Sequence, residues 1–355
     1  MKVHWSARTS VRRVIESFAP IVQITIAATL SYLFARFVLG HLHPLFSVTV
    51  VITALGFSRD ARPRRIIDTA LGMVLGIAAS EVLQTLLGEG VWQLALILFV
   101  CLVVARFVTG SNAFTLAAGI QAMLVYISEV PPGGPFVRTV DAVIGGVVAL
   151  LATAVIPRDP RGLAAKDAQK LFEVFLDTLS ALRFALAKVD HKIADAALNQ
   201  VRRTQPLVDN WRLSLDSAIA ISKVSPFLRK YRAELTGNLR LLRSMDLATR
   251  NLRVVVRRVD FLIRDGQPRD YLAKLVQEIY EASRLLADGY EDQIKLAEAQ
   301  QALLDVMHQL DPKRFGIADN LTEASVLLLL RPLLVDLLCA SGMNDDDARA
   351  ELPVI

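Results

Sequence analysis

Long apolar tracts dominate residues 18–156, whereas residues 157–355 mix apolar and charged positions as amphipathic helices do. A helix needs about 20 mostly apolar residues to cross the hydrocarbon core of a bilayer, within a range of about 17–25. Four tracts meet that length: residues 18–39, 66–87, 91–109 and 136–156. Two shorter tracts, 44–57 and 113–128, could each form a span, a re-entrant segment or a core helix. We interpret them as the second and fifth of six spans.

The change in pattern at Ile156-Pro157 divides the chain into parts of different character. Predicted are an N-terminal cytoplasmic segment (1–17), a six-helix transmembrane domain (18–156), a cytoplasmic helical domain (157–343) and an acidic flexible tail (344–355). The apolar run that starts at residue 18 is longer than the core of a signal peptide, so we expect an anchor that is not cleaved. The fold class is therefore an all-α membrane protein with a cytoplasmic bundle.

The positions of Lys and Arg predict the orientation, because basic residues gather in the short cytoplasmic loops of membrane proteins. With six spans, twelve basic residues lie near the inner ends and two near the outer ends. The inner set is Lys2, Arg8, Arg12, Arg13, Arg59, Arg62, Arg64, Arg65, Arg106, Arg158, Arg161 and Lys166, and the outer set is Arg36 and Arg138. We therefore expect a multi-pass protein of the bacterial inner membrane with both termini in the cytoplasm.

Two short motifs occur twice. The letters ARFV, which contain Arg36 and Arg106, recur 70 residues apart at the ends of two apolar tracts. The pattern R-x-x-D-x-x-x-G, followed four residues later by a small residue, recurs 73 residues apart. Its members are Arg65, Asp68, Gly72 and Gly76 in the first copy, and Arg138, Asp141, Gly145 and Ala149 in the second.

The duplication has an odd number of spans in each copy, so the two halves cross the membrane in opposite directions. Such 3+3 inverted repeats are typical of secondary transporters, with sites near the interface of the repeats. Residues three and four apart share a helix face, so each Arg lies beside its Asp and above two small residues that allow close packing. An Asp inside a membrane helix is costly unless it is paired or faces a polar cavity. The arginines could instead extend to the lipid headgroups.

The stretch HPLFSVTVVITALGFSRDARPRRIIDTALGMVLGIAAS, from His43 to Ser80, resembles the fusaric acid resistance protein-like (FUSC) or aromatic acid exporter superfamily. The resemblance covers the apolar block to Ile156 and extends more weakly beyond it. It implies a homodimer, since this chain carries a single membrane-plus-cytoplasmic unit, and an anion path lined by basic residues. Arg65 and Arg138 are the candidates for that path, followed by Arg36 and Arg106.

Residues 162–340 are expected to form about five helices, with breaks near His191, Ser225, Gly266 and Asp311. Between residues 231 and 262, leucines and valines form an apolar stripe, with several arginines at other positions. These arginines could form a solvated face of the bundle, contact anionic lipid headgroups, or line a vestibule that attracts organic anions. The apolar run 325–342 is interrupted by charged residues and a proline, so we interpret it as a buried helix of the bundle rather than a seventh span.

No nucleotide-binding, esterase or zinc-protease motif occurs in the sequence, and its two cysteines lie far apart. The external turn with His41 and His43 suits an ordinary interfacial loop better than a metal site. We therefore expect no enzyme activity, no cofactor, no metal and no nucleic acid, and a small organic anion and the lipid bilayer as partners.

The leading hypothesis is an exporter of small aromatic carboxylates, in which the arginines attract the substrate carboxylate and Asp68 and Asp141 hold them or carry protons. A passive dimeric anion channel is the first alternative. The second is a membrane-anchored scaffold whose bundle binds partner proteins.

Overall fold

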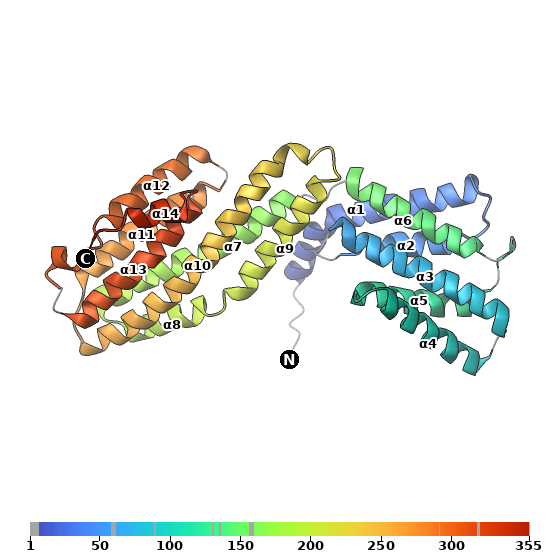
Figure 1. Ribbon diagram of the computed structural model, residues 1–355, viewed down its shortest axis with the longest axis horizontal. Coiled ribbons are helices and arrows are strands. Elements are labelled where there is room, and N and C mark those ends of the chain that lie inside the picture. The colour runs from blue at the N-terminus through green and yellow to red at the C-terminus, as the bar shows by residue number, and fades with distance from the viewer. Residues whose placement is uncertain are drawn as a thin grey trace. The chain divides into compact units, whose positions relative to one another are not determined.

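The computed structural model describes residues 7–57, 62–88, 90–129, 131–134, 136–155, 160–290, 292–317 and 320–354. Throughout these ranges the regular elements are helices (Figure 1). The chain divides into two compact units, residues 1–159 with 217–230, and residues 160–216 with 231–355. The expected boundary between residues 156 and 157 lies outside the described residues, as do residues 1–6 of the expected N-terminal segment.

Six helices, here called the membrane helices, make up most of the first unit. They are α1 (Ala7–Phe37), α2 (Leu45–Leu55), α3 (Pro63–Leu87), α4 (Val91–Val108), α5 (Asn112–Ile127) and α6 (Val137–Val155). Four of these contain apolar stretches long enough to cross a membrane, namely Ser17–Phe37 in α1 and the whole of α3, α4 and α6. The all-α membrane fold is thus confirmed.

The two remaining membrane helices, α2 and α5, are shorter. With 11 and 16 residues and a rise of about 1.5 Å per residue, they are about 16 and 24 Å long. The hydrocarbon core is about 30 Å thick, so neither helix covers it alone. Six spans therefore stay a prediction. Helix α1 begins at Ala7, and its apolar stretch Ser17–Phe37 starts close to residue 18, where the first span is expected.

The contacts between the membrane helices follow one scheme in both halves of the unit. Helix α1 packs on α2, and α4 packs on α5. The third helix of each half packs on the second helix of the other half: α3 lies along α5, and α6 along α2 (Figure 1). The same exchange joins α3 to α4 and α6 to α1, and α3 and α6 contact each other.

Small residues stand where the exchanged helices meet. A Cβ atom added to Gly72 or Gly76 would lie less than 3.0 Å from the backbone of Phe114 or Ala118 in α5. At Gly145 in α6 it would come equally close to the carbonyl oxygen of Ser47 in α2. Close approach of this kind stabilises helix pairs in lipid, where packing rather than the hydrophobic effect drives association.

The second unit is a bundle of further helices. They are α7 (Pro160–Lys188), α8 (His191–Val201), the first part of α9 (Gln205–Ser222), α10 (Arg232–Leu262), α11 (Asp270–Asp288), α12 (Gln293–Met307), α13 (Leu321–Ala340) and α14 (Asp345–Ala350). The breaks between α8 and α9 and between α11 and α12 were not expected. At the first, Thr204 bonds back to the carbonyl oxygen of Val201, and at the second Asp292 caps α12 through the amide of Ile294.

The end of the chain confirms one expectation and corrects another. Helix α13 is buried against α10, with Leu330, Leu333 and Leu337 all fully buried, so the apolar run 325–342 belongs to the bundle core. Residues 344–350, expected to be flexible, form α14 instead. Asn344 caps this helix, three aspartates fill its first turn and Arg349 its last, an order that suits the helix dipole.

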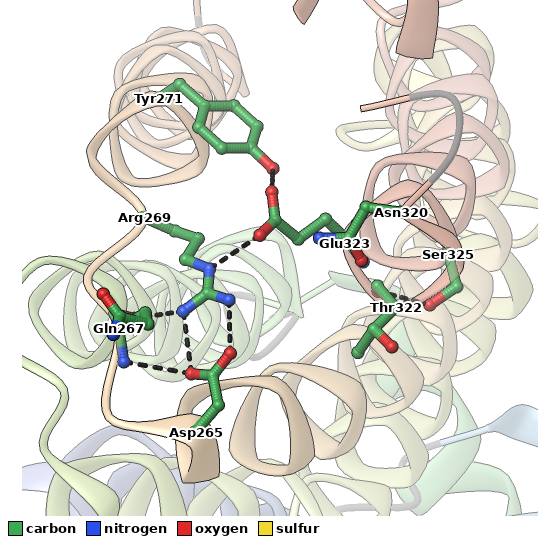
Figure 2. A network of polar contacts seen from close by, with 8 residues as sticks. All are labelled: Asp265, Gln267, Arg269, Tyr271, Asn320, Thr322, Glu323 and Ser325. Atoms are coloured by element: carbon green, nitrogen blue, oxygen red, sulfur yellow. Dashed lines mark hydrogen bonds and ion pairs between the residues drawn. The ribbon is translucent and has the colours of Figure 1, made fainter. Parts of the chain in front are cut away.

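A network around Arg269 connects three helices of the second unit (Figure 2). The Arg269 guanidinium, 7% exposed, donates to both carboxylate oxygens of Asp265, at 2.8 and 2.5 Å, and to Glu323 at the start of α13, at 3.1 Å. The Tyr271 hydroxyl donates to the other oxygen of Glu323 at 2.6 Å. Burial, together with this bond, raises the pKa of Tyr271 above its ordinary value. The backbone amide of Arg269 also bonds to Leu186 in α7.

The close contact of α3 with α5 predicts that Gly76→Leu destabilises the protein. The new side chain collides with the backbone of Ala118, so we expect a loss of at least about 1–3 kcal/mol. The matched control is Gly110→Leu, because a Cβ atom at Gly110 meets nothing within 4 Å. Thermal unfolding of both detergent-purified variants measures the difference, and equal midpoints would contradict the close packing.

The network around Arg269 predicts that Arg269→Met costs about 3–5 kcal/mol, because the carboxylate of Glu323 then stays half-buried without its cation. Arg264→Met is the control, since its pair with Asp260 is two-thirds exposed on the arginine side and such pairs contribute about 0–1 kcal/mol. The thermal midpoint should fall by several degrees in the first variant only. A similar fall of the thermal midpoint in both variants would show that the burial of the Arg269 ion pairs does not increase their contribution to stability.

Candidate functional site

A group of buried polar side chains lies at the N-terminal end of α6. Arg138 and Asp141, three residues apart on this helix, are 4% and 2% exposed. The loop between α1 and α2 supplies His41, and α3 supplies Glu81. This group, together with Thr139, is called the α6 cluster below.

Asp141 pairs with a histidine. Its Oδ1 lies 2.6 Å from Nδ1 of His41, whose side chain is 18% exposed. The backbone amide of His41 bonds to the carbonyl oxygen of Ala35 at 3.2 Å, which fixes the loop at the end of α1. We expected Asp141 to hold Arg138 or to carry a proton; in the structure its hydrogen-bond partner is His41, because the loop places the imidazole directly against the carboxylate.

Arg138 bonds to the end of a neighbouring helix instead. Its guanidinium donates to the carbonyl oxygens of Val125 at 3.1 Å, Ser128 at 2.9 Å and Glu129 at 2.6 Å. The last carbonyls of a helix have no partner within it and carry partial negative charge, so a cation suits this position. Arg138 also lies over the ring of Phe46, 5.8 Å from its centroid. It therefore caps α5 and connects that helix to α6.

Glu81 is a member of the cluster that our sequence analysis did not single out. It is 5% exposed and accepts a hydrogen bond from the Thr139 hydroxyl at 2.7 Å. The signal was present, because an acidic residue within the apolar tract 66–87 is costly in lipid unless it has a partner.

The bond between Glu81 and Thr139 also fixes the direction of α6. It joins Glu81, near the end of α3, to Thr139 at the start of α6. Further along α6, Gly146 lies against Ala70, which is nearer the start of α3. The two helices are therefore antiparallel. In contrast, α3 and α5 run parallel, since Gly72 faces Phe114 and the Ser80 hydroxyl bonds to Ala122.

The first copy of the repeated motif lies at the other end of this helix pair. Arg65 and Asp68 begin α3, so the antiparallel arrangement places them away from the α6 cluster. Both are half-buried, whereas Arg138 and Asp141 are almost fully buried. The structure thus separates the two Arg–Asp pairs rather than gathering them at one point.

The repeated ARFV motifs have matching structural roles. Arg36 donates to the carbonyl oxygen of Leu42 in the turn that follows α1. Arg106 donates to Gly110 at 2.9 Å and to the Asn112 side chain at 3.0 Å in the turn that follows α4. Each arginine therefore fixes the turn after its own helix.

Further polar side chains are buried between the membrane helices. Gln23 of α1 donates to the carbonyl oxygen of Ala152 in α6 at 3.1 Å, and both Gln23 and Gln121 are 2% exposed. Gln121 donates to the Thr49 hydroxyl at 3.5 Å, while its Oε1 has no hydrogen-bond partner among the described residues. The contacts between the membrane helices thus include buried polar side chains at several positions.

Comparison with known proteins identifies relatives of this chain. Over 356 aligned residues it is 29% identical to an uncharacterised protein of Corynebacterium glutamicum, covering 98% of this chain and 91% of the relative. It is 26% identical over 182 residues to proteins of Mycobacterium tuberculosis and Mycobacterium bovis named "Putative arylamide transporter". That alignment covers 50% of this chain and 49% of each mycobacterial protein.

The family comparison covers most of the membrane helices. Residues 27–152, from within α1 to near the end of α6, match the family model described as fusaric acid resistance protein-like. The match includes Arg65, Asp68, Arg138 and Asp141. The family resemblance predicted from the sequence is therefore confirmed over residues 27–152, which match the fusaric acid resistance protein-like family.

Proposed function

We propose that this protein exports small organic carboxylates, aromatic ones in particular, across the bacterial inner membrane, and that protons drive the export. The family match and the transporter name of the mycobacterial relatives support a membrane transporter rather than an enzyme. The name of these relatives, which refers to arylamides, favours a substrate with an aromatic ring. The observation that carries the proton coupling is the buried pair of Asp141 and His41.

The Asp141–His41 pair is suited to carry a proton at membrane depth. A carboxylate buried among membrane helices needs a partner, and histidine is the side chain that changes charge between pH 5 and 8. Uptake of one proton by the pair changes its net charge in a site that is almost closed to water. Each change alters the electrostatic cost for an organic anion that moves along the helices from Arg65 past this pair, and this links the proton to the substrate.

The arginines divide into two groups in this proposal. Arg65 is the candidate for direct contact with the substrate carboxylate, because it is half-buried at the start of α3, beside Asp68. Arg138 positions the α6 cluster rather than the substrate, since it already donates to three carbonyl oxygens at the end of α5. Arg36 holds the turn after α1 in the first half, and Arg106 holds the turn after α4 in the second half.

The helix directions support six spans arranged as a 3+3 inverted repeat. Helices α3 and α5 run parallel to each other and α6 runs antiparallel to α3, as an alternating path through six spans requires. The exchanged packing of α3 on α5 and of α6 on α2 is also what a two-fold relation between the halves predicts. In this arrangement both termini and the second unit lie in the cytoplasm. We further propose that two copies of the chain form a homodimer, as the family resemblance implies.

The proposal predicts that Asp141→Asn and His41→Gln abolish transport driven by a pH gradient, at least tenfold, because neither variant keeps the proton-carrying pair. The assay measures benzoate flux in proteoliposomes with an imposed gradient. His43→Gln is the matched control, an exposed histidine two residues from His41, and should leave the flux unchanged. Wild-type flux that ignores the gradient and only follows the benzoate concentration would favour the passive channel instead.

The inverted arrangement predicts that the turn between α5 and α6 faces the outside of the cell. A single cysteine introduced as Pro132→Cys, in a chain with Cys101→Ser and Cys339→Ser, should react in intact cells with a membrane-impermeant maleimide. Glu298→Cys, an exposed position in α12, should react only after the cells are opened. Protection of Pro132→Cys until opening would contradict both the repeat and the proposed path.

A further inference from the structure

The second unit contains an open groove of about 1390 Å³ beside α10. This volume exceeds the roughly 300–1,000 Å³ of usual small-molecule pockets, so a ligand would fill part of it. Its walls are one face of α10, the turn between α11 and α12, and the turn between α13 and α14. We call it the α10 groove.

The charges along the α10 groove leave two cations available. Arg161 is paired with Glu234 at 2.7 Å, and Arg349 with Asp345 at 2.8 Å. The Asp292 side chain is occupied as the cap of α12. Arg240 and Arg243, one turn apart on α10 and both exposed, form no hydrogen bond or ion pair with their side chains within the described part of the chain. Two adjacent guanidinium groups without partners suit a carboxylate.

Among the described residues that line the groove, one further acidic side chain remains, Asp336, which is partly buried and hydrogen-bonded. Asp336 accepts a hydrogen bond from Asn251 at 2.6 Å. Burial, more than any other cause, raises its pKa to about 6, although the bond from Asn251 lowers it. A carboxyl group with this pKa is still mostly ionised at pH 7 and takes up a proton as the pH falls toward 6, so Asp336 repels an anion less at mildly acidic pH.

Apolar side chains lie in the same groove. Leu247 is 51% exposed, and Leu296 and Met343 are partly exposed. The ring of Tyr290 is held there by a hydrogen bond of 3.1 Å from the Asn238 amide to its hydroxyl. Cations beside an aromatic ring and exposed leucines recognise an anion with an apolar body rather than an inorganic ion.

A glycine keeps the wall of the groove open. Gly237 lies within α10, where glycine weakens a helix relative to alanine. A Cβ atom added at this position meets nothing within 4 Å, so neither packing nor backbone strain accounts for the glycine. The absent side chain leaves space on the face of α10 that carries Arg240.

We propose that the α10 groove binds a small organic carboxylate with an apolar body, at a site separate from the membrane helices. Arg240 and Arg243 contact the carboxylate, and Tyr290, Leu247 and Leu296 contact the apolar body. The choice of an organic carboxylate rests on the proposed function, and the groove then gives the transporter a second site for the class of molecule that it carries.

Calorimetric titration of the purified full-length chain with sodium 2-naphthoate tests this site. Arg240→Gln with Arg243→Gln should weaken the binding at least tenfold. The control pairs Arg232→Gln with Arg257→Gln, two exposed arginines of α10 outside the groove, and should change it less than twofold. No binding to the wild type, or equal binding to both double variants, would overturn the proposal.

Gly237 provides an independent test that leaves the charges in place. Gly237→Phe should place its ring in the part of the groove beside Arg240 and weaken binding at least tenfold, whereas Gly237→Ala should retain binding and raise the thermal midpoint slightly. Binding that survives Gly237→Phe would place the ligand elsewhere and overturn the proposal.

Asp141→Asn separates the two proposals. It should abolish pH-driven flux while leaving naphthoate binding to the groove intact. If it abolishes the binding and the groove variants do not, the ligand occupies the membrane helices and the inference about the groove fails. If the groove binds but no variant or gradient affects flux, the proposed function fails and the inference about the groove stands.

Discussion

The close contact between helix backbones at Gly72, Gly76 and Gly145 is the constraint on which the membrane helices depend. Lipid is as apolar as leucine, so burial of apolar surface gives little reason for these helices to associate. Packing at short distance must supply it, and only residues without a large side chain permit that distance. Because each glycine meets the second helix of the other half, the same contacts that stabilise the fold also interleave its two halves. The α6 cluster exists because α6 is held against α2 and α3 in this way.

Once α6 is held there, each buried charge must find its own partner. Arg138 and Asp141 are neighbours on one helix, yet each bonds to a different element: Arg138 to the carbonyls at the end of α5, and Asp141 to His41 in the loop after α1. A paired charge costs far less in a membrane than a free one. The arrangement leaves Asp141 with a titratable partner instead of a permanent cation. The proposed proton coupling depends on this pairing, because a permanent guanidinium in the place of His41 would hold the aspartate ionised.

The sequence predicted the features that depend on local pattern. Apolar tract lengths gave the four long membrane helices, and the repeat pointed to the small residues that stand where helices cross. The partners of Arg138 and Asp141 could not be predicted, because they depend on where a loop and a helix end from distant parts of the chain come to lie. Glu81 was visible as a charge in an apolar tract, but its partner Thr139 follows only from the antiparallel packing of α3 on α6. The helix α14 was missed because its aspartates resemble a solvated tail unless their place at a helix N-terminus is recognised.

The two halves share their packing but differ in their chemistry, and this difference bears on mechanism. At the start of α6 the Arg–Asp motif is almost fully buried and bonded to its surroundings, whereas at the start of α3 the same motif is half-buried. Since α3 and α6 are antiparallel, these two environments lie at opposite ends of the helix pair. In the exporter that we propose, the accessible motif receives an anion from water, and the enclosed one, with its histidine, exchanges a proton. The exchanged packing of the two halves thus provides the scaffold, and the difference in burial sets the two ends of the α3–α6 pair apart.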